Sequence, residues 1–175
     1  MFPFQDVMID IETLGTVPGA KILTIGAVFF SRETAELSEP FYLALDPVKT
    51  PGTVSRSTFR WWKSQPQEAQ DAAFGGTVDP AKGMHMLAEY VNQADKVKPW
   101  GNGSVFDITM LEWLFAETGV GIPWDFWNIR DMRTVMDLAG RSSKDFPFEG
   151  TAHNALHDAV HQAKIVSLLL RDMKA

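Results

Sequence analysis

The sequence predicts an α/β fold in which a mixed five-stranded sheet is flanked by helices. Near the N-terminus, three strand-like segments follow one another through short links, which is typical of an antiparallel meander. Beyond them, helical and strand-like segments alternate, which is typical of parallel strands joined by crossover helices. The chain has 175 residues, 45 % of them hydrophobic, so we expect residues 1–175 to form a single domain.

The predicted strands are short and mostly rich in β-branched or aromatic residues. In the first of them Val7, Ile9 and Ile11 alternate with other residues, as they do in a buried strand. Residues 31–39 are polar and short enough to join the second and third strands as a hairpin. The five strands are expected at residues 7–13, 21–30, 40–45, 96–100 and 126–129.

Capping residues mark several predicted helices. Asp79 and Pro80 are typical of an N-cap and a first helical residue, and Ser57 and Ser104 can cap two other helices. Gly119 fits the end of the third helix. Helices are therefore expected at residues 57–64, 80–92, 104–118, 131–139 and 154–173, with loops at 65–78 and 140–150.

Composition excludes several classes of protein. The chain has no cysteine, which excludes disulfides, zinc–thiolate sites and thiol nucleophiles. We see neither a signal peptide at the N-terminus nor an apolar run of the roughly 18–20 residues that span a membrane, so we expect a soluble, cytoplasmic protein with no membrane partner. The net charge of −6 argues against a protein that grips long duplexes. It does not exclude an enzyme that handles one strand end, because bound metals would invert the local field.

Two acidic residues interrupt the first predicted strand. Side chains repeat with period two along a strand, so Asp10 and Glu12 project from the same face. Two like charges about 4 Å apart repel by roughly 4 kcal/mol at an effective dielectric of about 20. A buried strand tolerates such a pair only with a cation on it or with one carboxylate protonated, and Mg²⁺ prefers oxygen ligands of this kind. The alternative is a strand that ends at a solvated edge.

Two later stretches also carry acids. Asp107 lies in the first turn or so of a helix, where it either complements the helix dipole or belongs to a site. Asp158 lies near the start of the last helix if Asn154 caps that helix, and His153 then lies in the loop before it. A solvated helix start with surface histidines is the alternative. Two further acids, Asp131 and Asp137, are expected to be helix-start and surface residues.

Taken together, these motifs resemble one known family. Asp10-x-Glu12, Asn102 with Asp107, and His153-x-Ala155-x-x-Asp158 occur in the order seen in the DEDDh 3′→5′ exonucleases, which have a ribonuclease H-like fold. The resemblance covers essentially the whole chain. The run from Asp10 to Thr16 and the pair Trp61-Trp62 look most like the phage exodeoxyribonucleases and the related bacterial 3′→5′ exoribonucleases.

The resemblance implies a two-metal-ion hydrolase with Mg²⁺ or Mn²⁺ as cofactors. Asp10, Glu12 and Asp158 would hold the metal that carries the attacking water, and Asp10 with Asp107 would hold a second metal on the leaving-oxygen side. His153 would accept a proton from that water, since an imidazole suits general-base work at cellular pH. Metal pairs of this kind clamp both oxygens of an in-line displacement. The products would be nucleoside 5′-monophosphates.

The resemblance also implies substrate contacts at a single-stranded 3′ end. Glu12 and the backbone near Thr13 and Leu14 would contact the terminal 3′-hydroxyl, Leu14 would pack on the last base, and Asn102 would lie near the substrate backbone. One of Trp61 and Trp62 is expected to stack on a base, because basic residues flank them and such mixtures bind single strands. The basic residues expected to contribute are Arg56 and Arg60.

Two alternatives to this function stay open at the level of sequence. A catalytically silent module of the same fold would bind nucleic acid or a partner, although all four acids and the histidine are present. A phosphodiesterase would act on dinucleotides or other small substrates. The phage-like resemblance favours DNA over RNA, and a homodimer is among the assemblies that it allows.

Overall fold

The computed structural model describes residues 2–174 and contains one mixed sheet with the strand order β3-β2-β1-β4-β5. The first three strands are antiparallel neighbours, and the last two run parallel to β1. The predicted fold class, a mixed five-stranded sheet flanked by helices, is confirmed. The strands are β1 (Asp6–Thr13), β2 (Ile22–Phe30), β3 (Phe41–Ala44), β4 (Lys98–Gly101) and β5 (Arg130–Asp131).

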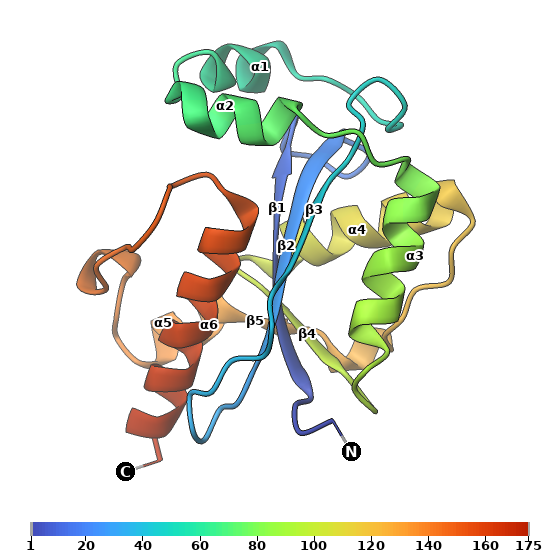
Figure 1. The fold of residues 1–175 in the computed structure, drawn as a ribbon. Coiled ribbons are helices and arrows are strands. Elements are labelled where there is room, and N and C mark those ends of the chain that lie inside the picture. The colour runs from blue at the N-terminus through green and yellow to red at the C-terminus, as the bar shows by residue number, and fades with distance from the viewer. Residues whose placement is uncertain (1, 175) are drawn as a thin grey trace.

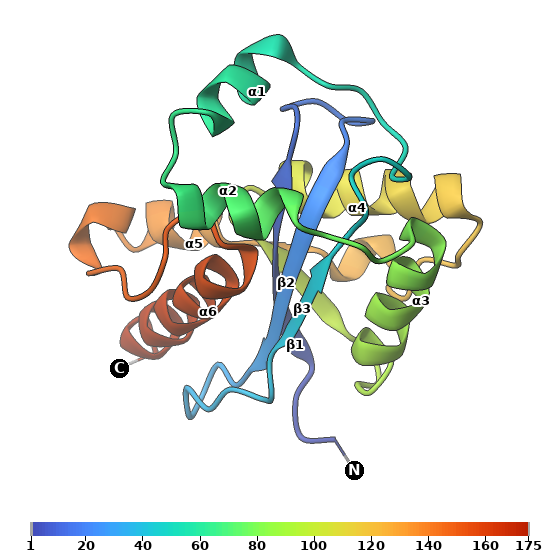
Figure 2. The ribbon, with the colours of Figure 1, turned by 45° about the horizontal axis from the view of Figure 1, so that its top comes forward.

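Helices cover both faces of the sheet and one of its ends. The helices α5 and α6 lie on one face, α3 and α4 lie on the other, and α1 and α2 lie across the end where β1 stops (Figures 1 and 2). None of the described helices is long and apolar enough to cross a membrane. The helices are α1 (Arg56–Trp62), α2 (Gln67–Phe74), α3 (Pro80–Val91), α4 (Ser104–Thr118), α5 (Met132–Leu138) and α6 (Ala155–Asp172), with 3₁₀ turns η1 (Phe126–Asn128) and η2 (Ser143–Asp145).

The alternation along β1 divides the core into two layers. Val7, Ile9 and Ile11 are buried against residues of α3 and α4. Met8 points to the opposite face and packs in a second cluster with residues of α6. Asp10 and Glu12 continue this second face toward the end of the strand, so the apolar layer under α6 gives way to acids there.

Helix α1 is fastened to the end of β1. The indole Nε1 of Trp62 donates to the carbonyl oxygen of Thr13 at 2.9 Å. The backbone N–H of Ser55 donates to the carbonyl oxygen of Leu14 at 2.7 Å. Ser55, rather than the predicted Ser57, is the N-cap of the helix, because its hydroxyl accepts from the N–H of Thr58. This attachment keeps α1 above the last residues of the strand.

Several element boundaries differ from the predictions. The segment expected as a loop at 65–78 contains α2, which forms because Ala69 and Ala73 pack against the buried side of α1. The strand expected at 126–129 is a 3₁₀ turn with exposed aromatic side chains, and the strand itself is displaced to Arg130–Asp131. The N-cap of α4 is Gly103 with φ of 97°, not Ser104. Asp131 caps α5, as the sequence predicted for a helix-start residue.

A glycine in the middle of β2 lets α6 approach the sheet. Gly26 pairs with Asp10 across the β1–β2 ladder. A Cβ atom at Gly26 would lie 2.2 Å from the carbonyl oxygen of Ala155 and 2.4 Å from the nitrogen of Leu156. The first turn of α6 therefore rests on the backbone of β2. This close approach brings Asp158, which lies in that turn, to Asp10.

We expect Gly26→Ala to destabilise the protein by roughly 1–3 kcal/mol or more, because the added methyl group overpacks the contact between β2 and α6. Urea unfolding would measure the change in the free energy of unfolding. The matched control is Gly121→Ala, whose Cβ meets no heavy atom within 4 Å and which should change stability by no more than about 0.5 kcal/mol. Equal stability of the two variants would contradict this account of the contact.

Candidate active site

Three carboxylates meet where β1 ends beneath the first turn of α6. Asp10 and Glu12 come from β1 and Asp158 comes from α6, and one oxygen of each lies within 4.8 Å of the others. The alternation of β1 places the first two on one face, and the N-cap Asn154 fixes where α6 begins. The side chain of Asn154 accepts from the N–H groups of Leu156 and His157. The predicted start of the last helix is confirmed.

Asp107 approaches the same place from the other side of β1. It lies in the first turn of α4 and is 3 % exposed, and the nearby backbone N–H of Ile11 partly offsets the rise that burial causes in its pKa. Its carboxylate packs against the last residue of β4, because a Cβ on Gly101 would lie 2.9 Å from Asp107 Oδ2. Asp107 is outside the group of three oxygens, but its charge acts on Asp10 more strongly than that of any other acid.

Burial makes the ionised state of these acids costly. Desolvation is the largest cause of a raised pKa at each of the four, and the charges of neighbouring acids add to it at Asp10 and Glu12. The pKa of Glu12 rises to about 8 and that of Asp107 to about 7. Near neutral pH the group therefore retains protons unless cations replace them.

The group fits divalent cations of the Mg²⁺ and Mn²⁺ type. It offers only oxygen ligands, which such hard ions prefer. Asp158 Oδ2 is buried and has no hydrogen-bond partner among residues 2–174, although a buried carboxylate oxygen without a partner is costly. A cation would satisfy this oxygen and relieve the repulsion among the acids.

His153 is separate from the other two histidines of its stretch. It lies in the loop before α6 with a left-handed backbone, φ of 61°, a conformation that costs a residue with a side chain roughly 1–2 kcal/mol. The Trp61 ring lies edge-on to its imidazole, with 4.8 Å between the centroids, and the proximity of His153 partly offsets the rise in the pKa of Asp158. His157 Nδ1 instead accepts from the N–H of Thr151, and His161 packs on Phe148.

A pocket of about 420 Å³ opens beside Glu12. It runs between the end of β1, helix α1 and the start of α4, and its walls include Thr13, Trp61 and Phe106. Another pocket, of about 490 Å³, lies between α1 and α2 on the far side of Trp62 and contains none of the four acids. Of these two pockets, the one beside Glu12 borders the acidic group.

The structure separates the predicted substrate-binding residues into accessible and buried ones. Trp61 is 40 % exposed, whereas Trp62 is 1 % exposed and belongs to the interior, so the predicted stacking contact is confined to Trp61. Leu14 is 5 % exposed and packs with Trp62, which leaves it little surface for a base. The Thr13 hydroxyl is committed to the carbonyl oxygen of Gly15 at 2.6 Å.

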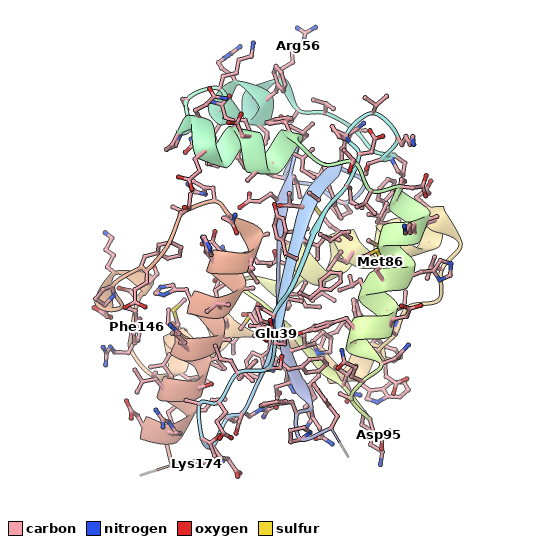
Figure 3. All side chains as sticks on the ribbon, viewed as in Figure 1. Glu39, Arg56, Met86, Asp95, Phe146 and Lys174 are labelled. Carbon is pink, nitrogen blue, oxygen red and sulfur yellow. The ribbon has the colours of Figure 1, made fainter. Side chains whose placement is uncertain are left out.

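The basic residues of α1 do not converge on the acids. Arg56 projects from α1 away from the rest of the molecule (Figure 3). Arg60 is exposed. Asn102 lies in the turn after β4, where its side-chain oxygen accepts from Arg133 at 3.3 Å. Asn102, which was predicted to lie near the substrate backbone, is therefore in the turn between β4 and α4, close to Asp107.

Sequence reasoning missed one side chain that holds an acid in place. Gln162 is 5 % exposed, and its Nε2 donates to Asp10 Oδ1 at 2.7 Å. It lies one helical turn after Asp158, so the two side chains share a face of α6. That four-residue spacing was the available signal.

The fold is shared with solved exonucleases. The nuclease domain of 3′hExo, described as a DEDDh family member bound to rAMP, has a TM-score of 0.64 at 14 % identity over 97 % of this chain and 94 % of that chain. Exonuclease I of E. coli in complex with a dT13 oligonucleotide has a TM-score of 0.71 at 16 % identity, over 93 % of this chain but only 40 % of that chain. S. pombe Pop2p in a Mg²⁺- and Mn²⁺-bound form has a TM-score of 0.61 at 14 % identity, over 94 % and 82 %.

The fold is the ribonuclease H-like fold of the DEDDh exonucleases, and where its first strand ends it carries a group of acids that could hold a metal ion. The chain belongs to the 3′-5′ exoribonuclease Rv2179c-like domain family, whose model matches residues 5–170. It is also 27 % identical to the exodeoxyribonuclease of Enterobacteria phage T4, over 95 % of this chain and 89 % of that protein. The predicted family is confirmed.

We expect Mg²⁺ or Mn²⁺ to raise the melting temperature by several degrees over EDTA. Ions that bind only the folded state stabilise it by about 2.7 kcal/mol at one hundred times the dissociation constant, and each kcal/mol moves the midpoint by roughly 2–4 °C for a chain of this size. Differential scanning calorimetry would measure the shift. Asp158→Asn should reduce it, whereas Asp137→Asn, at an exposed acid of α5, should not. A wild-type melting temperature that neither metal changes would count against the site.

Proposed function

We propose that the protein is a metal-dependent 3′→5′ exonuclease that removes nucleoside 5′-monophosphates from single-stranded 3′ ends with two divalent cations and His153 as general base. The observation that carries this proposal is the group formed by Asp10, Glu12 and Asp158, with a loop histidine and a pocket beside it. The family and the phage relative support the direction and class of the reaction.

The four acids divide between two cation positions. Asp10, Glu12 and Asp158 would hold one cation, because their oxygens already converge. Asp10 and Asp107 would hold the other, because Asp107 faces Asp10 from the opposite side and has the strongest charge effect on it. Bound divalent cations would neutralise the phosphate and acidify the attacking water. Gln162 would keep Asp10 oriented between the two positions through its hydrogen bond.

His153 would accept the proton of the attacking water. Its position in the loop frees its imidazole from the helix, and the ring of Trp61 restricts where the imidazole can lie. The Asp158 carboxylate would stabilise the imidazolium that forms when His153 accepts the proton. Orientation by a neighbouring acid is the usual arrangement for a catalytic histidine.

The pocket beside Glu12 would hold the terminal nucleotide. Its volume of about 420 Å³ falls within the range of small-molecule sites. Trp61 and Phe106 present aromatic surface in its walls, and stacking on such rings holds unpaired bases with little dependence on sequence. Glu12 lies in the pocket wall, where it would meet the terminal 3′-hydroxyl. A base in this pocket cannot remain paired, which favours single-stranded ends.

The relatives of this chain include enzymes named for RNA and for DNA. The family description names an exoribonuclease and the phage relative is an exodeoxyribonuclease. We propose DNA as the preferred substrate on the resemblance to the phage exodeoxyribonuclease. A single domain spanning residues 1–175, a cytoplasmic location and homodimeric assembly also stay predictions of the sequence.

The test of this function is degradation of 5′-labelled, single-stranded DNA and RNA of equal sequence with Mg²⁺, Mn²⁺ or EDTA. We expect a ladder that shortens from the 3′ end, release of nucleoside 5′-monophosphates, no reaction in EDTA, and a faster reaction on DNA. Binding without cleavage would instead support the catalytically silent module. Activity confined to dinucleotides would support the small-substrate phosphodiesterase.

His153→Ala should lower kcat by about 10²–10⁴, which is the usual contribution of a general base, while the metal-dependent rise in melting temperature persists. His161→Ala is the matched control and should retain most activity, because His161 packs on Phe148 at the surface of α6. His157 is a poorer control because its ring anchors the N–H of Thr151 in the loop that leads to His153. Comparable losses in the His153 and His161 variants would exclude the general-base assignment.

A further inference from the structure

An arginine to which no role has been assigned lies beside Asp107. Arg133 belongs to the first turn of α5 and is exposed. Its Nε donates to the Asn102 side chain at 3.3 Å, and its guanidinium carbon lies 3.3 Å from the position that a Cβ on Gly103 would occupy. The guanidinium therefore rests on the turn between β4 and α4, and Gly101, the residue of β4 just before this turn, packs on Asp107.

The positive charge of Arg133 is available to a ligand. Within residues 2–174, no carboxylate forms an ion pair with it. Arg133 nevertheless lies near the site, because the turn on which it rests leads directly into α4, whose first turn carries Asp107. A guanidinium with only one long hydrogen bond, next to buried acids, retains most of its donors for a further partner.

The other arginines either have partners within the protein or lie away from the acids. Arg32 pairs with Asp6, Arg141 pairs with Asp145, and the guanidinium of Arg130 donates to the carbonyl oxygens of Trp127 and Ile129. Arg56 points away from the molecule (Figure 3). Arg60 belongs to α1, and Arg171 belongs to the last turn of α6. Among the described arginines, Arg133 is therefore the one that lies on the turn leading to Asp107.

The position of Arg133 indicates which phosphate it would meet. The pocket for the terminal nucleotide lies on the Glu12 side of Asp10, between β1, α1 and α4. Asp107 follows Phe106 of the pocket wall in the first turn of α4, and the turn on which Arg133 rests leads into that helix. A strand with its last nucleotide in the pocket and its scissile phosphate at Asp10 would continue in the 5′ direction past Asp107 and over this turn.

We propose that Arg133 binds the phosphate one linkage 5′ of the scissile phosphate, and so makes the enzyme select chains that carry a second phosphate. The proposal rests on the proposed exonuclease function. Arginine suits this task because its planar fork of donors can bind two phosphate oxygens at once. Asn102 would hold the guanidinium over the turn through the hydrogen bond that the structure already shows.

The test compares an unmodified single-stranded oligonucleotide with one that carries a neutral methylphosphonate at the second linkage from the 3′ end. With the wild-type enzyme, removal of this negative charge should lower kcat/KM for the first cleavage roughly 10- to 100-fold, the range expected for a charge-assisted hydrogen bond. Arg133→Ala should lower kcat/KM on the unmodified strand by a similar factor and should show little further loss on the modified one. Arg133→Lys should recover part of the activity, as a point charge without the fork.

The matched control is Arg141→Ala, which removes one positive charge from the loop after α5 and should keep the wild-type ratio between the two strands. Melting temperatures with and without Mg²⁺ would show whether each variant keeps its fold and metal response. Equal losses of Arg133→Ala on both strands, or a wild-type enzyme indifferent to the modification, would overturn the assignment. Failure of the wild type to release mononucleotides from the unmodified strand would instead count against the proposed function itself.

Discussion

Repulsion among buried carboxylates is the constraint on which the site depends. Two unit charges about 4 Å apart repel by roughly 4 kcal/mol at an effective dielectric of about 20, and here Asp10, Glu12 and Asp158 lie within such reach of one another. Burial adds its own cost, and it is the largest cause of the raised pKa at every one of these acids. The folded chain therefore needs protons or cations at this point. In the proposed function, cations would bind here because the protein has already brought their ligands together.

The rest of the fold supplies the backbone geometry that keeps the acids in place. Gly26 removes the side chain that would hold α6 away from the sheet, and Asn154 starts the helix so that Asp158 lies in its first turn. Trp62 anchors α1 to the end of β1 from inside. This anchor leaves the neighbouring Trp61 free to face the pocket and His153. Packing in the interior thus determines the position of groups at the surface.

Local patterns in the sequence were sufficient for the parts of the structure that local forces determine. The alternation in β1 and the cap at Asn154 predict where Asp10, Glu12 and Asp158 lie along their elements, and the structure brings these three together. Helix α2 escaped prediction because its stability comes from packing Ala69 and Ala73 on the interior, not from a cap or a strong pattern. The prediction of a strand at 126–129 was wrong because the aromatic side chains there are exposed and the segment forms a 3₁₀ turn instead of pairing with β4.

Other parts of the site depend on contacts between distant segments. Adjacent tryptophans must face different ways on a helix, but only tertiary packing decides that Trp62 is the buried one. Gly26 carried a signal, since a glycine inside a strand often marks a close approach of another backbone, yet nothing in the sequence names Ala155 as its partner. Arg133 belongs to no motif, and its place beside Asp107 follows from the pairing of β5 with β4.

The most direct test of the central constraint is the free energy of unfolding as a function of pH, measured with EDTA and with saturating Mg²⁺. In the metal-free protein the pKa of Glu12 is raised to about 8 and that of Asp107 to about 7, whereas acids in an unfolded chain titrate near about 4. From about pH 5 to about pH 8 the folded state then binds more protons than the unfolded state, so stability should fall as pH rises. Mg²⁺ replaces those protons and should remove most of the decline, and subtracting the two profiles cancels groups outside the site. A metal-free profile that does not fall between these pH values, or one that falls equally with Mg²⁺, would contradict the account.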